Sequence, residues 1–228
     1  MIVENQTLRN KTNIFSSREK AGNYVAKLLQ KESFDYLLII PNGGLPVGFG
    51  FLQEINTKPA EVGILIVKKI HVPWSTESGM GALTPDGDIF LNKELIDSYS
   101  IKNQEVQKQI QEAKKRIKYI QKAYGVEETI NVKDKSVLIL DDGIASGFSM
   151  LASVRWIRKK GAKRILIGTP TAPKRSLKKI EDKVDKIFCV NIRTVLRFAV
   201  ADAYQHWYDL SLEEAVNYYK KICDIIEK

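Results

Sequence analysis

Residues 137–149 read Val-Leu-Ile-Leu-Asp-Asp-Gly-Ile-Ala-Ser-Gly-Phe-Ser. The four apolar residues predict a buried strand that ends at Asp141 and Asp142, and the small residues after them predict a turn into a helix from about Phe148. Ligands of open α/β sheets bind at such carboxyl ends of strands. The turn and the helix N-terminus favour a phosphate, whereas the two carboxylates suit sugar hydroxyls or a divalent cation. We therefore expect this stretch to bind a phosphorylated pentose.

Apolar runs and helical patterns alternate along the rest of the chain. Because strands that alternate with helices form parallel sheets, the predicted fold is α/β, a doubly wound and mostly parallel sheet flanked by helices. The expected strands are 36–40, 62–67, 136–141, 164–168 and 186–191. The expected helices are 46–54, 104–124, 148–160, 175–181 and two that begin at the capping boxes Ser16-x-x-Glu19 and Ser211-x-x-Glu214.

The composition fits one domain over residues 1–228. Of these, 44% are hydrophobic, and the longest apolar runs, such as 137–140, are far too short to cross a membrane. The net charge of +9 suits a polyanionic substrate, and the spread of lysines over helices favours solvated faces over a nucleic-acid surface. Cys189 and Cys223 lie far apart and lack metal-ligand spacing. We expect a reduced, cytoplasmic protein that binds neither membrane nor nucleic acid.

Two segments interrupt the alternation. Residues 71–92 are loop-like, and the turn Pro85-Asp86-Gly87 predicts a hairpin that joins 81–83 to 89–91 as a flap over the site. The inserted helix, at about 103–124, carries one apolar stripe on a charged surface. Such a stripe suits packing on the domain or on a second subunit, and a homodimer is expected.

The 137–149 stretch resembles the ribose-5-phosphate signature of type I phosphoribosyltransferases. The matching features are the two acids, the Ser146-Gly147 pair and the second hydroxyl at Ser149. Residues 41–48, Pro-Asn-Gly-Gly-Leu-Pro-Val-Gly, resemble the family's pyrophosphate loop, in which the peptide before the Asn42 position is cis. Lys68-Lys69 resembles a basic pair of the adenine enzymes, and there is local similarity to the hypoxanthine-guanine enzymes.

One branch of the family is the most similar, a group of bacterial and archaeal predicted phosphoribosyltransferases whose acceptor is not settled. The resemblance runs from about residue 15 to residue 219. The features shared with that branch are Arg18, Ala21-Gly22, Glu77, Gly81-Ala82, Leu91-Asn92 and residues 198–208, which resemble a small C-terminal hood over the acceptor within about 192–210.

The resemblance implies transfer of the 5-phosphoribosyl group from phosphoribosyl pyrophosphate to a nucleobase, with a purine favoured. Mg²⁺ would be bound mainly through the substrate, beside Asp141 and Asp142, which hold the ribose hydroxyls and stabilise positive charge on the ring. Glu77 of the flap is the candidate general acid or base. The implied binding residues are, for the 5-phosphate, Gly143, Ile144, Ala145, Ser146, Gly147, Phe148 and Ser149; for the pyrophosphate, Asn42, Gly43, Gly44, Lys68 and Lys69; and for the acceptor, Phe198, Val200 and Asp202.

Within the basic pair, alternation along a strand lets only one lysine reach the substrate, and Lys69 is favoured as the catalytic one. In the hood, Phe198 is the first candidate for stacking on the base, with Val200 beneath it. Trp207 and Tyr208 are expected to pack in the core rather than contact a ligand.

Two residues depart from the family's pattern. Asn42 stands where an arginine or lysine is usual, so its side chain cannot neutralise pyrophosphate, although the amides of residues 42–44 still can. Ala145 stands where the hypoxanthine-guanine enzymes have a carboxylate. These departures keep two alternatives open: a regulatory protein that binds the donor or a nucleotide without turnover, and a hydrolase or transferase with a non-base acceptor.

Overall fold

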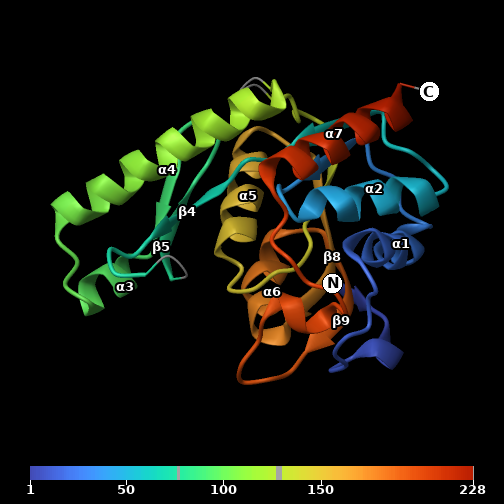
Figure 1. Cartoon of the computed structure of the whole chain (residues 1–228), viewed down its shortest axis with the longest axis horizontal. Coiled ribbons are helices and arrows are strands. Elements are labelled where there is room, and N and C mark those ends of the chain that lie inside the picture. The colour runs from blue at the N-terminus through green and yellow to red at the C-terminus, as the bar shows by residue number, and fades with distance from the viewer. Residues whose placement is uncertain (76–77, 127–129, 228) are drawn as a thin grey trace.

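A parallel sheet forms the centre of the computed structural model, which describes residues 1–75, 78–126 and 130–227. Its strand order is β1-β9-β8-β7-β2-β3, and the α/β fold predicted from the sequence is confirmed (Figure 1). The strands are β1 (Ile2–Glu4), β2 (Tyr36–Ile39), β3 (Glu61–Ile64), β7 (Ser136–Leu140), β8 (Arg164–Pro173) and β9 (Lys186–Arg193). Strand β1, which pairs with β9 at the edge of the sheet, was not predicted. Its three residues are too few to show the alternation of apolar and polar residues that indicates a strand.

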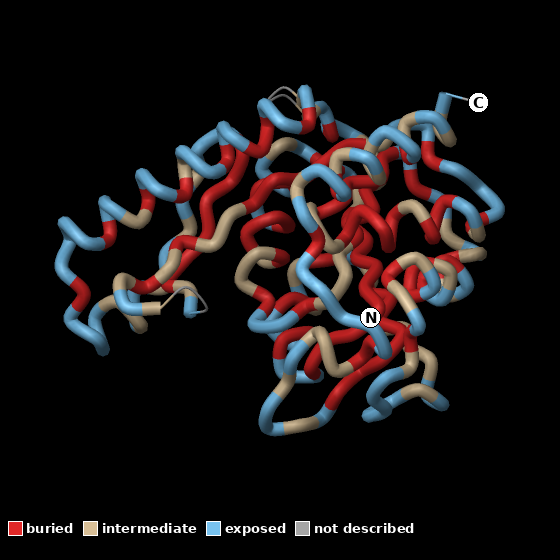
Figure 2. Tube along the Cα trace, in the orientation of Figure 1, coloured by how far each residue is buried: buried red, intermediate tan, exposed pale blue. Residues whose placement is uncertain are grey.

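Alternate residues of each strand face opposite sides of the sheet, and each side has its own core. Leu37 and Ile39 of β2 pack with α1 (Arg18–Leu29), α2 (Gly44–Glu54) and α7 (Leu212–Ile226). Leu38, between them, packs instead with α5 (Phe148–Lys159) and α6 (Lys174–Ile180). Both faces are therefore covered, and Figure 2 shows the buried backbone running through the middle of the molecule.

The ends of the elements show which local signals were correct. Ser211 caps α7 as predicted, accepting a hydrogen bond from the Glu214 amide at 3.2 Å. The cap of α1 was placed one residue too early, because Ser17 and not Ser16 accepts from the Lys20 amide. Three short 3₁₀ helices, η1 (Gln6–Leu8), η2 (Glu181–Lys183) and η3 (Val200–Ala203), complete the connections.

A second sheet forms a lobe beside the first. It is antiparallel, in the order β4 (Lys68–His71), β5 (Gly79–Leu83), β6 (Ile89–Leu91), and α3 (Lys93–Ser98) follows it. The predicted hairpin is correct, since Gly81 pairs with Leu91 and Leu83 with Ile89. The tip of this hairpin is fixed to the body of the protein, by which we mean the parallel sheet and the helices that cover it. The contact is a hydrogen bond that Asp86 accepts from the Trp156 indole of α5.

Helix α4 (Asn103–Tyr124) covers the lobe, and its apolar stripe is buried within the chain. The stripe packs against β4, β5 and α7. Of the two possibilities that the sequence left open, packing on the domain or on a second subunit, the structure shows packing on the domain. It therefore gives no support to a dimer. Its buried residues include Val106, Ile110, Ala113, Ile117, Ile120 and Tyr124. None of the helices in the described part of the chain has the length and apolarity needed to span a membrane.

Candidate functional site

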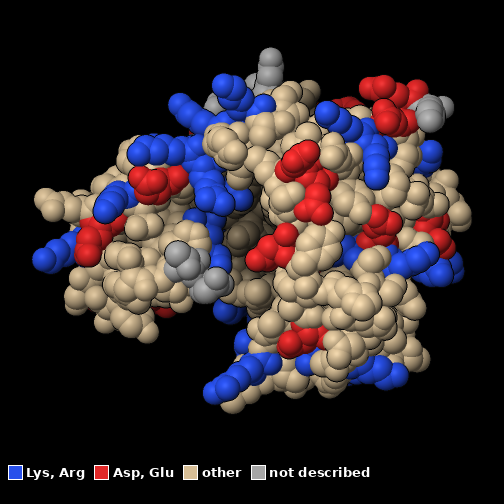
Figure 3. All heavy atoms as spheres, in the orientation of Figure 1, with Lys and Arg blue, Asp and Glu red and all other residues tan. Residues whose placement is uncertain are grey.

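The acid pair lies at the carboxyl end of β7, where the body meets the lobe. Two adjoining hollows of about 550 and 710 Å³ open there. Figure 3 shows the hollowed face, with Lys and Arg side chains gathered along the edge of the lobe that borders it. The two hollows share five of their lining residues, some from the body and some from the lobe: Asn42, Gly43, Lys68, Arg116 and Asp142.

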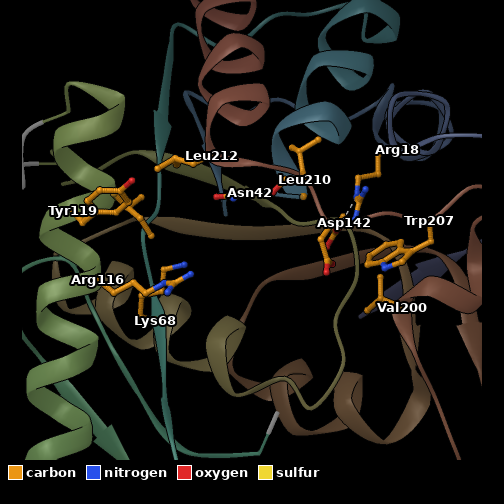
Figure 4. Close-up of a pocket in the computed structure, with 13 residues that line it drawn as sticks. Arg18, Asn42, Lys68, Arg116, Tyr119, Asp142, Val200, Trp207, Leu210 and Leu212 are labelled. Atoms are coloured by element: carbon orange, nitrogen blue, oxygen red, sulfur yellow. Dashed lines mark hydrogen bonds and ion pairs between the residues drawn. The ribbon is translucent and has the colours of Figure 1, made fainter. Parts of the chain in front are cut away.

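Asp141 and Asp142 are held by short contacts. The Asp142 amide donates to Asp141 Oδ1 at 2.8 Å, and Arg18 Nε donates to Asp142 Oδ2 at 2.9 Å. The Arg18 guanidinium also donates to the Tyr208 carbonyl at 3.0 Å. It lies 4.0 Å from the centre of the Trp207 ring (Figure 4). Burial raises the pKa of both carboxyls, and the charge of Asp142 raises that of Asp141 further, whereas Arg18 opposes the rise at Asp142.

The loop over residues 41–44 lies directly against the acid pair. A Cβ atom on Gly43 would come 1.9 Å from Asp142 Oδ2, so a larger residue there would displace the Asp142 carboxylate from its present position. The Pro41–Asn42 peptide is cis, as the resemblance implied. The amide of Asn42 is engaged at both ends, because Nδ2 donates to the Leu210 carbonyl at 3.2 Å and Oδ1 accepts from the Tyr124 hydroxyl at 3.4 Å.

The turn after Asp142 has most of its amides available. Among the described residues, the amides of Gly143 and of residues 145–149 have no hydrogen-bond partner. Ile144 is the exception to the prediction, because its amide donates to the Thr171 carbonyl at 3.0 Å and its side chain is buried. That bond ties the turn to β8, so the Ile144 amide cannot face a phosphate here. Ser146 is exposed, and Ser149 lines the larger hollow.

The lobe brings its basic residues to the other side of the hollows. Both lysines reach the site, because Lys68 lines both hollows and Lys69 lines the larger one. The expectation that only one of them can face the substrate is therefore not supported, and the preference for Lys69 stays a prediction. Burial lowers the pKa of Lys68 to about 8, and the nearby charge of Arg116 contributes. Glu77, the predicted general acid or base, falls outside the described residues.

Comparison with known proteins identifies the family. A model of the phosphoribosyl transferase domain matches residues 10–203. The chain belongs to this family. Two curated Mycobacterium tuberculosis proteins, "Putative phosphoribosyl transferase Rv0571c" and "Putative phosphoribosyl transferase MT0597", are each 27% identical to it over 210 residues. That similarity covers 89% of this chain and 46% of each relative, so the chain spans about half the length of these relatives.

A solved structure shares the fold of this phosphoribosyl transferase domain. The crystal structure of TT1426 from Thermus thermophilus superposes with a TM-score of 0.71 at 19% identity, over 90% of this chain and 97% of that one. At this identity the likeness concerns the fold alone. It agrees with a parallel sheet, flanked by helices, that carries a smaller lobe.

The segment of the phosphoribosyl transferase domain that was expected to contact the acceptor lies only partly at the hollows. Val200 lines the smaller hollow, whereas Phe198 and Asp202 line neither. Asp202 Oδ2 instead accepts from the Ala199 amide at 3.3 Å and closes its own turn. Trp207, expected in the core, is 38% exposed and lines the smaller hollow beside Arg18. Tyr208 is also exposed, at 52%.

The two carboxylates at the site are oxygen donors of the kind that hard divalent cations prefer. No cluster of three or more His, Cys, Asp or Glu that could hold a metal occurs in the described part of the chain. Asp141 and Asp142 nevertheless place carboxylate oxygens beside the hollows. Mg²⁺ keeps most of its ligands as water and substrate phosphates, so one or two carboxylates are a sufficient protein contribution. The acid pair therefore fits the Mg²⁺ that the phosphoribosyl transferase family implies.

Arg116, which lines both hollows, and Tyr119, which lines the smaller one, reach the site from α4 but were not predicted as site residues. The spread of basic residues over helices favoured a solvated face instead. Helical spacing tells which residues of α4 share a face, but it does not tell which face borders the acid pair. Only the packing of the lobe on the body supplies that relation.

Proposed function

We propose that this protein transfers the 5-phosphoribosyl group of phosphoribosyl pyrophosphate to a nucleobase, with a purine favoured, and releases pyrophosphate. The observation that supports this function most is that three parts of the chain meet at one edge of the sheet. These are the acid pair, the turn with available amides and the 41–44 loop, whose Gly43 touches Asp142. Membership of the phosphoribosyl transferase family supports the same reaction.

The donor would lie along this edge of the sheet. Its 5-phosphate accepts hydrogen bonds from the amides of Gly143 and of residues 145–149, at the N-terminus of α5, with hydroxyls from Ser146 and Ser149. Its ribose hydroxyls bond to Asp141 and Asp142, whose negative field stabilises the oxocarbenium-like state. Binding would require Arg18 to share or release its contact with Asp142.

The pyrophosphate and the acceptor would occupy the two sides of that ribose. Amides of residues 42–44 and the Lys68 ammonium bind the leaving pyrophosphate, and Mg²⁺ held with it supplies charge neutralisation. The base enters beside Val200 and Trp207, which line the smaller hollow. The bond from the anomeric carbon to the pyrophosphate oxygen breaks, a bond to the base nitrogen forms, and that nitrogen loses its proton to a general base, for which Glu77 stays the candidate.

A panel of acceptors tests this function. The full chain is incubated with Mg²⁺, phosphoribosyl pyrophosphate and either adenine, guanine, hypoxanthine or orotate, and pyrophosphate release is followed against a sample without base. We expect release that depends on a purine. Release without any base would indicate a hydrolase. Binding of the donor without release on any base would contradict the proposal and favour the regulatory alternative.

Binding of the donor should weaken as the pH rises through about 8. The protonated form of Lys68 attracts the pyrophosphate, and its pKa of about 8 means that the free protein loses this charge above that pH. The Lys68→Arg variant keeps its charge, because an arginine stays protonated. Between pH 7 and pH 9 we expect the wild-type protein to lose about tenfold more affinity than the variant, measured by calorimetric titration of the donor. Equal losses in the two proteins would remove Lys68 from the site.

A further inference from the structure

The pyrophosphate loop of this chain lacks a cation of its own. Position 42 carries an asparagine, and both ends of its amide are engaged within the protein, by Leu210 and by Tyr124. The side chain of Asn42 therefore offers no positive charge to a ligand, and one of its two amide hydrogens is already used by the Leu210 carbonyl. A diphosphate group bound at this loop would still carry negative charge that backbone amides only partly compensate.

Helix α4 is joined to this same loop. Tyr124, in its last turn, is the residue whose hydroxyl donates to Asn42. Arg116 lies eight residues earlier, so a rise of 1.5 Å per residue places it about 12 Å back along the helix. At that point Arg116 lines both hollows together with Lys68, opposite Asp142 (Figure 4).

The charge of Arg116 forms no ion pair with the acidic residues that the structure describes. Glu112, one turn earlier on α4, forms an ion pair with Lys115 at 3.2 Å instead. Within the described ranges, neither Arg116 nor Lys68 has an acidic partner. Two such neighbouring cations, facing a hollow, are an arrangement that suits a polyanion.

We infer that Arg116 binds the diphosphate group of the donor and supplies from α4 the positive charge that position 42 does not supply. This inference rests on the proposed function for the identity of the ligand. The guanidinium offers a planar fork of donors that can bind two phosphate oxygens at once. With Lys68, it makes α4 and β4 the cationic wall of the site, facing the acidic wall formed by Asp141 and Asp142.

Binding measurements with two ligands distinguish a role of Arg116 at the diphosphate from a general weakening of the whole site. Inorganic pyrophosphate with Mg²⁺ probes the diphosphate position, and ribose 5-phosphate probes the phosphate turn and the acid pair. For Arg116→Gln, we expect pyrophosphate to bind about tenfold more weakly and ribose 5-phosphate to bind within about twofold of the wild-type protein, by calorimetric titration at about 0.15 M salt. Arg116→Lys keeps the charge but not the fork, so its loss should be smaller.

The control is Lys122→Gln on the same helix. Lys122 is exposed, lines neither hollow, and its loss changes the net charge equally. We expect no more than about a twofold change with either ligand. The inference is overturned if Arg116→Gln binds pyrophosphate as the wild-type protein does, if it loses both ligands equally, or if the wild-type protein does not bind pyrophosphate. The acceptor panel tests the proposed function separately, because pyrophosphate can bind at Arg116 whether or not any base is converted.

Discussion

The Asp142→Asn variant is expected to lose turnover by about a thousandfold or more. Asparagine has the same shape as aspartate but no negative charge, so the developing positive charge on the ribose loses its nearest stabilising carboxylate. The variant also deprives Arg18 of its ionic partner, since Arg18 Nε donates to Asp142 Oδ2. Initial rates with saturating donor and the best base of the panel measure the effect.

Asp224→Asn is the matched control for this variant. Asp224, in α7, is exposed, lines neither hollow and loses the same charge. We expect its rate to stay within about threefold of the wild-type rate, as is usual for an exposed charge. An Asp142→Asn protein that folds, by circular dichroism, and keeps a tenth of the wild-type rate would contradict the assignment of the acid pair.

The parts of the site that the sequence predicted are those set by neighbours in the chain. The strand before Asp141 follows from four apolar residues, and the turn after Asp142 follows from small residues that leave amides available. The hairpin follows from Pro85-Asp86-Gly87, because that turn chemistry is local. Each of these depends on contacts within a few residues, which is the range over which a sequence pattern carries information.

The parts that the sequence did not predict depend on packing between distant segments. Arg116 and Trp207 come to the hollows only because α4, which packs on β4, β5 and α7, and the segment around Trp207 both lie next to the acid pair in the folded protein. Ile144 lies in the matched motif, but a hydrogen bond to Thr171 of β8 turns its amide inward. Lys68 and Lys69 could not be ranked from alternation, because alternation gives two faces without saying which one meets the acids.

Substitution of Gly22 by alanine is expected to destabilise the protein by about 3 kcal/mol, which lowers Tm by about 6–12 °C. Helices α1 and α2 cross at glycines, where a Cβ on Gly22 would lie 2.1 Å from the Val47 carbonyl oxygen and 2.7 Å from the Phe51 amide. Both atoms belong to backbone and cannot rotate away. The better helix propensity of alanine returns only about 1 kcal/mol, so the clash decides the sign.

The same variant should also weaken the site, because the crossing positions two of its parts. Arg18 is the first residue of α1, and α2 begins at Gly44, the last residue of the 41–44 loop, so helices forced apart would draw Arg18 away from Asp142. Gly125→Ala is the control. At Gly125 φ is +64° and no atom of the described residues lies within 4 Å of the added Cβ, so only backbone strain of about 1 kcal/mol is expected. Thermal unfolding and donor affinity of the two variants are measured in parallel. We expect Gly22→Ala to lose more thermal stability and more donor affinity than Gly125→Ala. Equal losses would mean that the two helices move apart at no cost in stability and that their crossing does not position Arg18.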